Sequence, residues 1–460
     1  MLQILQAYDR SPIAEVETED GDVLDAKLDL AARAFRDRDH WLKPHERIEM
    51  LYRLASLMEP MREKFSQLIA QEGGKPLADA IVETNRAIDG VRNAAEELRN
   101  FAGREIPMGL TAASANRWAF TTKEPIGVVA AISAFNHPLN LIVHQVVPAI
   151  ATGCPVIVKP APATPLCGIE FVRLVREAGL AEPWCQTFLP SENAVAERLA
   201  TDPRVAFLSF IGSARVGWYL HSKLAPGARC ALEHGGAAPA IVDRSADLDQ
   251  VIEPLVKGGY YHAGQVCVST QRIFVHADIQ AEFVERFVAR VKALRVGDPL
   301  SLETEVGPLI HPREADRVQS WIEEAATGGG RIAVGGERLS ATTLRPAVLL
   351  QPPASSKISR DEVFGPLTCI YSFTKLDEAI KAANSLPVAF QASIFTRDIG
   401  PALRAAERLD ASAVMVNDHT AFRTDWMPFA GRRHSGCGIG GIPWSMREMT
   451  QEKMIVLRQA

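Results

Sequence analysis

Apolar side chains recur at helical spacing from residue 45 to residue 103, with a break at Gly73-Gly74-Lys75-Pro76. Beyond Gly127 the pattern changes to short apolar runs that are typical of buried parallel strands, each followed by a helical stretch. The expected strands span 127–132, 155–158, 187–189 and 205–210. Two expected helices span 139–152 and 165–177, and two more are expected to begin after residue 191 and at residue 214. This alternation predicts an open parallel sheet of the kind that binds nucleotides.

A second alternating series follows Glu233, with a helix expected near 248–262, a strand at 272–276 and a helix at 279–294. The glycine pair 235–236 is the expected hinge between the two series. The fold class is therefore α/β, with two doubly wound, Rossmann-like domains. The chain closes with the apolar run 453–457, which predicts a terminal strand that needs a partner.

Composition limits the classes of function. The chain has 460 residues, 47% of them hydrophobic and 23% charged, so two or three domains are expected. The formal net charge of -5, with both signs interspersed, disfavours nucleic-acid and membrane partners. Seven scattered cysteines without a close Cys-x-x-Cys pair argue against a disulfide framework and a metal site. No signal peptide or long apolar run is evident, so a cytoplasmic location is expected.

Two groups along the chain suggest covalent chemistry. Cys267 is flanked by small residues, and Glu233 opens the run Glu233-His234-Gly235-Gly236. A thiol and a carboxylate are the groups needed to form and then hydrolyse a thioester. Taken alone, the cysteine would more often be a small buried side chain, and the glutamate a solvated charge at a turn. The other motifs decide between these interpretations.

Eight short runs, in a fixed order across residues 45 to 457, resemble the aldehyde dehydrogenase superfamily. The runs are Lys123-Glu124-Pro125-Ile126-Gly127-Val128-Val129, Ala134-Phe135-Asn136-His137-Pro138-Leu139, Val158-Lys159-Pro160, Phe210-Ile211-Gly212-Ser213, Glu233-His234-Gly235-Gly236, Gly264-Gln265-Val266-Cys267, Glu362-Val363-Phe364-Gly365-Pro366 and Met427-Pro428-Phe429-Ala430-Gly431. The branch that the chain resembles includes the phosphonoacetaldehyde, lactaldehyde and non-phosphorylating glyceraldehyde-3-phosphate dehydrogenases.

The resemblance implies oxidation of an aldehyde to a carboxylic acid through a thiohemiacetal and a thioester on Cys267. Asn136 and the cysteine N–H would stabilise the oxyanion, and Glu233 would activate water for deacylation. The implied domains are a dinucleotide-binding domain (1–102 and 125–235), a catalytic domain (236–432) and an oligomerisation arm (103–124 and 433–460). A homodimer or homotetramer is expected.

The cofactor implied is NAD or NADP. Gly212 and Ser213 lie between an expected strand and helix, where backbone N–H groups favour a pyrophosphate. The resemblance adds Lys159 on the adenosine ribose, Glu362 on the nicotinamide ribose, and Phe364 and Phe135 nearby. NAD-preferring members commonly place a glutamate where this chain has Pro162. Both coenzymes are therefore open, with a slight preference for NAD as the commoner one.

The substrate hypothesis rests on His137, Arg423 and Arg86, which match tunnel positions in the resembling family. Together they could hold an acidic tail, so a short polar aldehyde with a carboxylate, sulfonate or phosphonate is expected. The alternatives are an Arg423–Asp425 pair, surface pairs of Arg86 with Glu83 and Asp89, and a merely structural histidine. Relatives that bind phosphate carry an arginine immediately before the nucleophile, where this chain has Val266, which makes a full phosphate cradle doubtful.

Three rival functions compete with aldehyde oxidation to the free acid. A CoA-acylating aldehyde dehydrogenase would lack the deacylating Glu233, and a non-catalytic structural homologue would have lost Cys267, Asn136 or Glu233. A cysteine hydrolase could pair Cys267 with His262, five residues earlier in the chain. Each residue needed for aldehyde oxidation is present, so the dehydrogenase is the preferred function.

Overall fold

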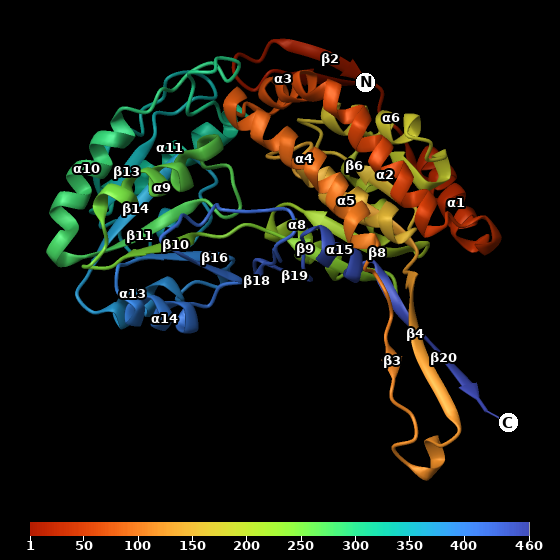
Figure 1. Ribbon diagram of the computed structural model, residues 1–460. Coiled ribbons are helices and arrows are strands. Elements are labelled where there is room, and N and C mark those ends of the chain that lie inside the picture. The colour runs from red at the N-terminus through yellow and green to blue at the C-terminus, as the bar shows by residue number, and fades with distance from the viewer. Residues whose placement is uncertain (460) are drawn as a thin grey trace.

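The computed structural model describes residues 1–459 and shows two lobes with a long arm projecting from one of them (Figure 1). Each lobe is built on its own mainly parallel sheet with helices on both faces. This arrangement confirms the predicted α/β class with two Rossmann-like sheets. A two-stranded hairpin precedes both lobes, formed by β1 (Leu2–Leu5) and β2 (Pro12–Val16).

The first lobe carries a six-stranded sheet. Its strands, in spatial order, are β19 (Gly436–Cys437), β9 (Arg229–Glu233), β8 (Val205–Ile211), β5 (Val128–Ile132), β6 (Val156–Lys159) and β7 (Cys185–Thr187). All neighbours are parallel except β19, which runs antiparallel to β9. Every residue of β5 and β6 is buried, because helices exclude water from both faces.

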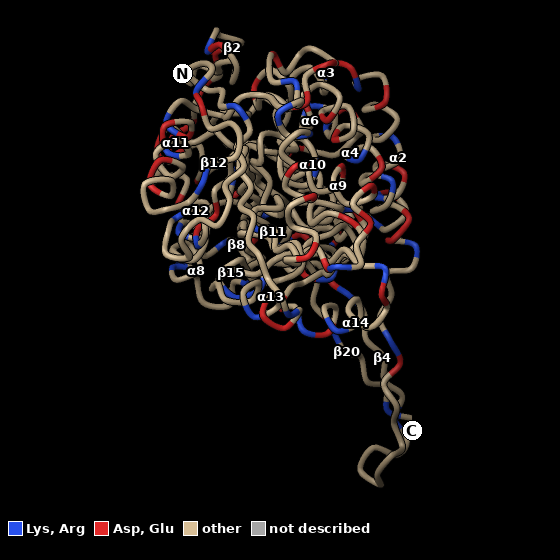
Figure 2. Tube along the Cα trace, turned by 90° about the vertical axis from the view of Figure 1, so that its left-hand side faces the viewer, with Lys and Arg blue, Asp and Glu red and all other residues tan. Residues whose placement is uncertain are grey.

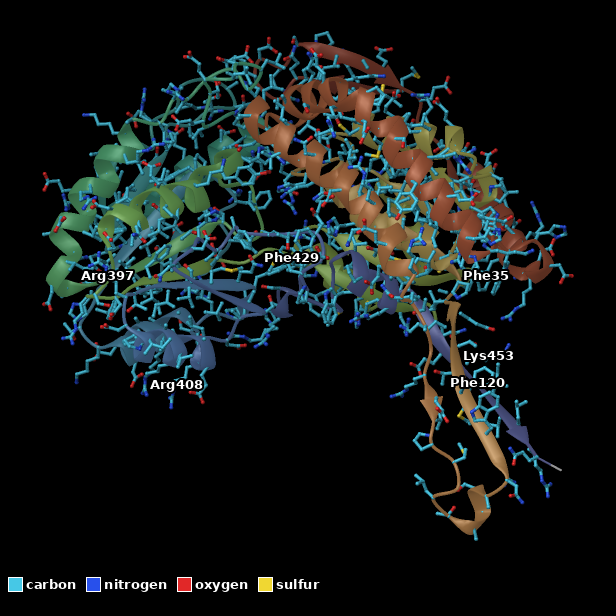
Figure 3. All side chains as sticks on the ribbon, viewed as in Figure 1. Phe35, Phe120, Arg397, Arg408, Phe429 and Lys453 are labelled. Atoms are coloured by element: carbon cyan, nitrogen blue, oxygen red, sulfur yellow. The ribbon has the colours of Figure 1, made fainter. Side chains whose placement is uncertain are left out.

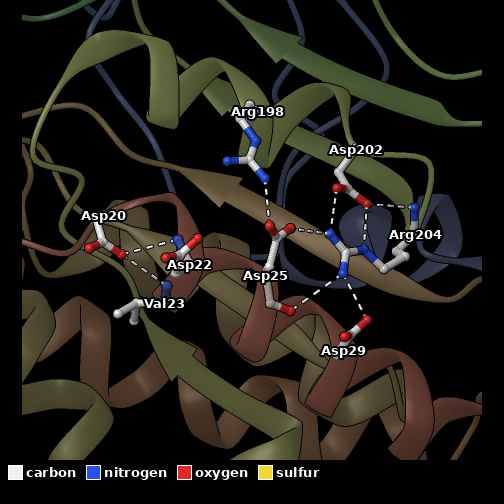
Figure 4. Close-up of polar contacts among 8 residues, drawn as sticks. All are labelled: Asp20, Asp22, Val23, Asp25, Asp29, Arg198, Asp202 and Arg204. Carbon is white, nitrogen blue, oxygen red and sulfur yellow. Dashed lines mark hydrogen bonds and ion pairs between the residues drawn. The ribbon is translucent and has the colours of Figure 1, made fainter.

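Helices cover the two faces of this sheet unequally. The larger core lies under α2 (Pro44–Met58), α3 (Arg62–Gly73), α4 (Leu77–Leu98), α5 (Asn140–Thr152), α6 (Leu166–Glu177) and α15 (Ile442–Glu448). The opposite face packs on α1 (Gly21–Arg36), α7 (Asn193–Thr201) and α8 (Ala214–His221). Figure 4 shows how Arg204, just before β8, joins Asp25 and Asp29 of α1 to Asp202, with N–O distances of 2.7, 2.8 and 2.7 Å. This network fixes the first helix against the sheet.

One strand expectation was wrong by two residues. The run 187–189 was expected as a strand, but β7 occupies Cys185–Thr187. The N–H of Leu189 donates instead to the carboxylate of Glu19, 2.9 Å away, and Pro190 has no N–H to continue a ladder. Phe188 is fully buried, and its N–H makes the last backbone hydrogen bond to β6, at the carbonyl of Val158, 2.9 Å away, so beyond this residue the apolar run reflects packing.

The second lobe carries a seven-stranded sheet. Its strands, in spatial order, are β12 (Arg331–Val334), β13 (Ala347–Leu350), β14 (Leu367–Phe373), β11 (Thr270–His276), β10 (Ala238–Val242), β16 (Gln391–Phe395) and β17 (Ala413–Val416). One face packs on α9 (Leu248–Tyr260), α10 (Gln280–Lys292), α11 (Pro312–Thr327) and α12 (Lys357–Arg360), and the other on α13 (Leu376–Ala383) and α14 (Ile399–Arg408). A short bridge, β15 (Val388–Ala389) with β18 (Arg432–Arg433), lies beside it.

The arm is a three-stranded antiparallel sheet of β20 (Thr450–Arg458), β4 (Arg117–Pro125) and β3 (Glu105–Ile106). Figure 3 places Phe120 and Lys453 along it, away from both lobes. The tail was expected to belong to the arm from residue 433 onward. Residues 433–449 instead return to the first lobe, because β19 pairs with β9 and α15 packs on α5 and α4.

Residues of both charge signs are interspersed along the Cα trace in Figure 2. Among residues 1–459, no helix combines the length and the apolar character that a membrane span requires.

Candidate active site

A cavity of about 1320 Å³ opens between the lobes, at the carboxyl ends of the strands. Every residue predicted for the site lines it, namely Arg86, Phe135, Asn136, His137, Lys159, Gly212, Ser213, Glu233, Cys267, Glu362, Phe364 and Arg423. They come from α4, β6, β9 and the segments after β5 and β8 in one lobe, and from the segments before β11, before β14 and after β17 in the other. The tertiary structure thus brings both halves of the expected chemistry into one cleft.

Cys267 lies in the loop between a short turn, η5 (Tyr261–Gly264), and β11. Burial raises the pKa of its thiol to about 12, Arg423 lowers that pKa, and the nearby carboxyl groups Glu233 and Glu362 raise it further. Forming the thiolate at neutral pH therefore depends on a positive charge in the cleft and on a base that takes the proton. Arg423, which lines the same cavity, supplies such a charge.

Asn136 lies in the β5–α5 loop, directly across from the nucleophile loop. Its side-chain N–H donates to the backbone carbonyl of Gln265 at 2.9 Å. Gln265 is itself held, since its side chain donates to Pro308 and accepts from Ile310. The amide group of Asn136 carries two N–H donors, so one can fix the nucleophile loop while the other remains for an oxyanion.

Glu233 is the last residue of β9 and lines the cleft from the first lobe, whereas Cys267 lines it from the second. Burial raises the pKa of its carboxyl group, and Arg423 opposes the shift. Gly440 borders this carboxylate so closely that a Cβ at residue 440 would overlap Oε1 of Glu233. A small cavity of about 10 Å³ also borders Glu233 and is lined in part by Ser209 and Ser445. That volume corresponds to about one water molecule.

The cofactor candidates form the open end of the cavity. Burial lowers the pKa of Lys159 to about 8, and its ammonium group donates to the carbonyl of Pro160 at 3.1 Å. Burial raises the pKa of Glu362 to about 8, and its Oε1 has no hydrogen-bond partner among residues 1–459. A buried, unpaired carboxylate oxygen is costly unless a ligand hydroxyl fills the place. The ammonium group of Lys159 and the carboxylate of Glu362 therefore fit the ribose hydroxyl groups of a dinucleotide.

The remaining cofactor candidates frame the same end. Gly212 and Ser213 precede α8, with their backbone at the N-terminus of that helix. Phe135 and Phe364 meet edge to face, with ring centroids 5.8 Å apart. Phe364 adopts a positive φ of 47°, a strained conformation that is typical of functional loops.

Arg423 is the strongest candidate for an anion site. Its guanidinium lies 3.6 Å from the ring centroid of Phe429, which Figure 3 labels at the junction of the lobes. One N–H group lies 3.3 Å from Nδ1 of His144, and its Nε has no partner in the described part of the chain. Burial lowers the pKa of this guanidinium, although it remains charged at any ordinary pH. The expected alternative, a pair with Asp425, is not formed.

Arg86 and His137 differ from expectation in what they bind. Arg86 does not pair with Glu83 or Asp89; it makes two hydrogen bonds to Asp425, at 3.2 and 2.7 Å. His137 lies 3.2 Å from the hydroxyl of Tyr261, and burial lowers its pKa well below the usual value. His137 can therefore offer a hydrogen bond but no charge at neutral pH, which leaves Arg423 as the least satisfied cation.

Sequence patterns did not reveal the network around Asp425. Its carboxylate accepts from Asn140 at 3.1 Å, from His144 at 2.8 Å and from Arg86, and these bonds hold its pKa well below the usual range. Asn140 and His144 lie in α5, far from Asp425 in sequence, and neither belongs to a recognisable motif. The one signal in the sequence was an aspartate two residues after Arg423.

The Cys–His hydrolase is not supported. His262 is fully buried, and neither ring nitrogen has a hydrogen-bond partner within residues 1–459. Burial lowers the pKa of His262 well below the usual value, with Lys75 adding to the effect. Its ring contacts His137 and Tyr261 and does not bond to the Cys267 thiol.

Comparison with known proteins agrees with the geometry. The model of the aldehyde dehydrogenase family matches residues 1–455. The 3-sulfolactaldehyde dehydrogenase of Priestia aryabhattai is 36% identical over 456 residues, which cover 99% of this chain and 94% of the relative. Aldehyde dehydrogenase 21 from Physcomitrella patens, solved with the reaction product succinate, superposes with a TM-score of 0.96 at 33% identity and covers 99% of this chain and 95% of its own.

A third match is glyceraldehyde-3-phosphate dehydrogenase GapN from Methanocaldococcus jannaschii, solved with NADP. Its TM-score is 0.95 at 32% identity, with 100% of this chain and 99% of that chain covered. The resemblance inferred from eight motifs is thereby confirmed. The chain belongs to the aldehyde dehydrogenase family and is an NAD(P)-dependent aldehyde dehydrogenase.

Proposed function

We propose that this enzyme oxidises a short aldehyde whose far end carries a sulfonate or a carboxylate. The observation that carries the proposal is Arg423, a half-buried arginine that lines the same cavity as Cys267 and whose buried Nε has no partner within the described residues. Arg423 is close enough to Cys267 to lower the pKa of the thiol. A substrate that reaches both groups must therefore be short.

A monoanionic tail fits this cavity better than a phosphate dianion. Arg86, the second arginine, already shares its charge with Asp425, and the residue before the nucleophile is the buried Val266. One free guanidinium offers charge-assisted hydrogen bonds to two oxygens of a sulfonate or carboxylate. The names of two similar proteins, a sulfolactaldehyde dehydrogenase and an enzyme solved with succinate, support the same class.

The proposed roles follow from the contacts. Cys267 attacks the carbonyl, and the second N–H of Asn136 and the backbone N–H of Cys267 stabilise the oxyanion. NAD(P)+ supplies the hydride acceptor, held by Lys159, Glu362 and the N-terminus of α8. Glu233, half-buried and with a raised pKa, removes a proton from the water that hydrolyses the thioester.

The substrate proposal is tested with Arg423→Met, which keeps much of the apolar stem but removes the charge. The kcat/KM for 3-sulfolactaldehyde or succinate semialdehyde should fall about 30- to 150-fold, because one charge-assisted interaction contributes about 2 to 3 kcal/mol. The kcat/KM for a neutral aldehyde of equal length should fall by a clearly smaller factor, which reports the effect of Arg423 on the thiol alone. The surface variant Arg408→Met serves as the control (Figure 3).

Arg423 also influences the thiol, so a second measurement separates the two effects. Alkylation of Cys267 by neutral iodoacetamide reports thiolate formation without an anion site. If Arg423→Met slowed alkylation and both aldehydes by the same factor, Arg423 would act on the nucleophile alone, and the acidic-tail proposal would be rejected.

We also propose that copies of this chain assemble through the arm, as a homodimer or homotetramer, and act in the cytoplasm. Trp118, Met454, Val456 and Leu457 are exposed on the paired strands β4 and β20, which would be an aggregation hazard if they stayed bare. Seven free cysteines suit a reducing compartment. Light scattering should show a dimer or tetramer at micromolar concentration, and a monomer would contradict the assembly.

A further inference from the structure

Three side chains of the types that bind metal ions lie close together at the edge of the first sheet where β19 pairs with β9. His221 ends α8, Cys230 lies in β9 and Cys437 lies in β19. One ligand atom from each residue lies within 4.8 Å of the other two, and the two sulfur atoms are 3.8 Å apart. None of these residues has a role in the chemistry described above.

The pairing of β9 and β19 explains why the sulfurs meet. Cys437 is opposite Leu232, and Cys230 is two residues from Leu232, so the two thiols lie on the same face as diagonal neighbours. The strand order places them together although 207 residues separate them in sequence.

We propose that His221, Cys230 and Cys437 bind a borderline-soft divalent cation, Zn²⁺, with water as the fourth ligand. Thiolate and imidazole are the ligands that zinc prefers, and two sulfurs each about 2.3 Å from a tetrahedral zinc lie about 3.8 Å apart. The sulfur separation in the structure matches this value. Small rotations of the side chains would bring all three ligand atoms to bonding distance.

The surroundings favour a cation at this place. Glu448 lies near both thiols, and its negative charge attracts a metal ion. His221 is exposed and both cysteines are half-buried, which leaves a path of entry. The indole of Trp218 packs on the imidazole of His221 and restricts its orientation, with centroids 5.4 Å apart.

Bound metal would join three segments that frame the active site. The helix α8 follows Gly212 and Ser213, β9 ends at Glu233, and β19 lies just before Gly440. A ligand that binds only the folded state stabilises it by mass action. Zinc should therefore raise the melting temperature and hold the strand that carries the proposed deacylating base.

The experiment uses the full-length Cys267→Ser protein, in which the accessible active-site thiol cannot compete for the metal. Titration with Co²⁺ as a spectroscopic probe should give a sulfur-to-cobalt charge-transfer band at one equivalent, and Zn²⁺ should displace it. Cys437→Ser and Cys230→Ser should each abolish the band, and His221→Ala should weaken binding at least tenfold. His40→Ala, at an exposed histidine outside the cluster, is the matched control.

Three outcomes would overturn the proposal: no thiolate band, a band that survives in Cys437→Ser, or a Cys230–Cys437 disulfide that forms even with zinc present. Circular dichroism of each variant identifies loss of folding. If a cysteine variant did not fold, His221→Ala would still decide the matter through its binding constant, because His221 is exposed and not part of the core.

Discussion

Replacing Gly440 with alanine should separate the two half-reactions. The new Cβ would overlap Oε1 of Glu233 and would lie 3.1 Å from its Cδ and 3.0 Å from the carbonyl of Phe429. Gly440 does not have a positive φ, so the backbone itself tolerates alanine and the contact alone is tested. The backbone carbonyl cannot yield easily, and the carboxylate of Glu233 must therefore move.

The magnitude follows from this displacement. An unstrained separation requires the carboxylate oxygen to shift by about 1 Å or more, and misplacing a catalytic group by 1 Å can cost about 100-fold in rate. Neither Cys267 nor Asn136 supplies one of the three atoms nearest to the new methyl group. Acylation and hydride transfer should therefore remain close to normal, whereas thioester hydrolysis should slow about 100-fold.

Stopped-flow absorbance of the reduced nicotinamide measures both phases. The variant should give a burst of about one equivalent per active site, followed by a slow steady state. Gly400→Ala, where a Cβ would meet nothing within 4 Å, is the control and should behave like the parent protein. An unchanged steady-state rate, or a burst that slows as much as the steady state, would refute the proposed contact with Glu233.

Other predictions follow from the same contacts. Gly235→Ala would place a Cβ over the Glu362 carboxylate, so the KM for the coenzyme should rise at least tenfold while alkylation of Cys267 stays normal; an unchanged KM would exclude Glu362 from the cofactor site. Burial lowers the pKa of His144 to about 4 from 6.5, so the unfolded chain gains a proton first as the pH falls. The free energy of unfolding should then drop by about 3 kcal/mol between pH 6.5 and pH 4, and His144→Gln should flatten this slope in urea titrations. Pro162→Glu should lower kcat/KM for NADP at least tenfold relative to NAD, because it sets a carboxylate near the 2′-phosphate; equal effects on both coenzymes would contradict this placement.

Local patterns in the sequence were enough to predict most of the elements and the motif residues. Buried parallel strands such as β5 and β6 need uninterrupted apolar runs, and those runs are visible in one dimension. Cys267, Asn136 and Glu233 each lie in a short motif, so the order of residues along the chain identifies them. The same patterns were two residues off at β7, because the ladder makes its last hydrogen bond at Phe188 and the apolar side chains there serve packing.

Which charges are free and which distant groups meet depends on the packing of the whole chain. Arg86 and Arg423 looked equivalent in the sequence, but Asp425 engages Arg86 and leaves Arg423 with an Nε that has no partner within residues 1–459. The cysteines of β9 and β19 carry no spacing motif, and they meet because the tail returns to the first sheet. The physical reason is that secondary structure follows local periodicity, whereas ion pairs and ligand clusters depend on strand order and helix packing between segments far apart in sequence.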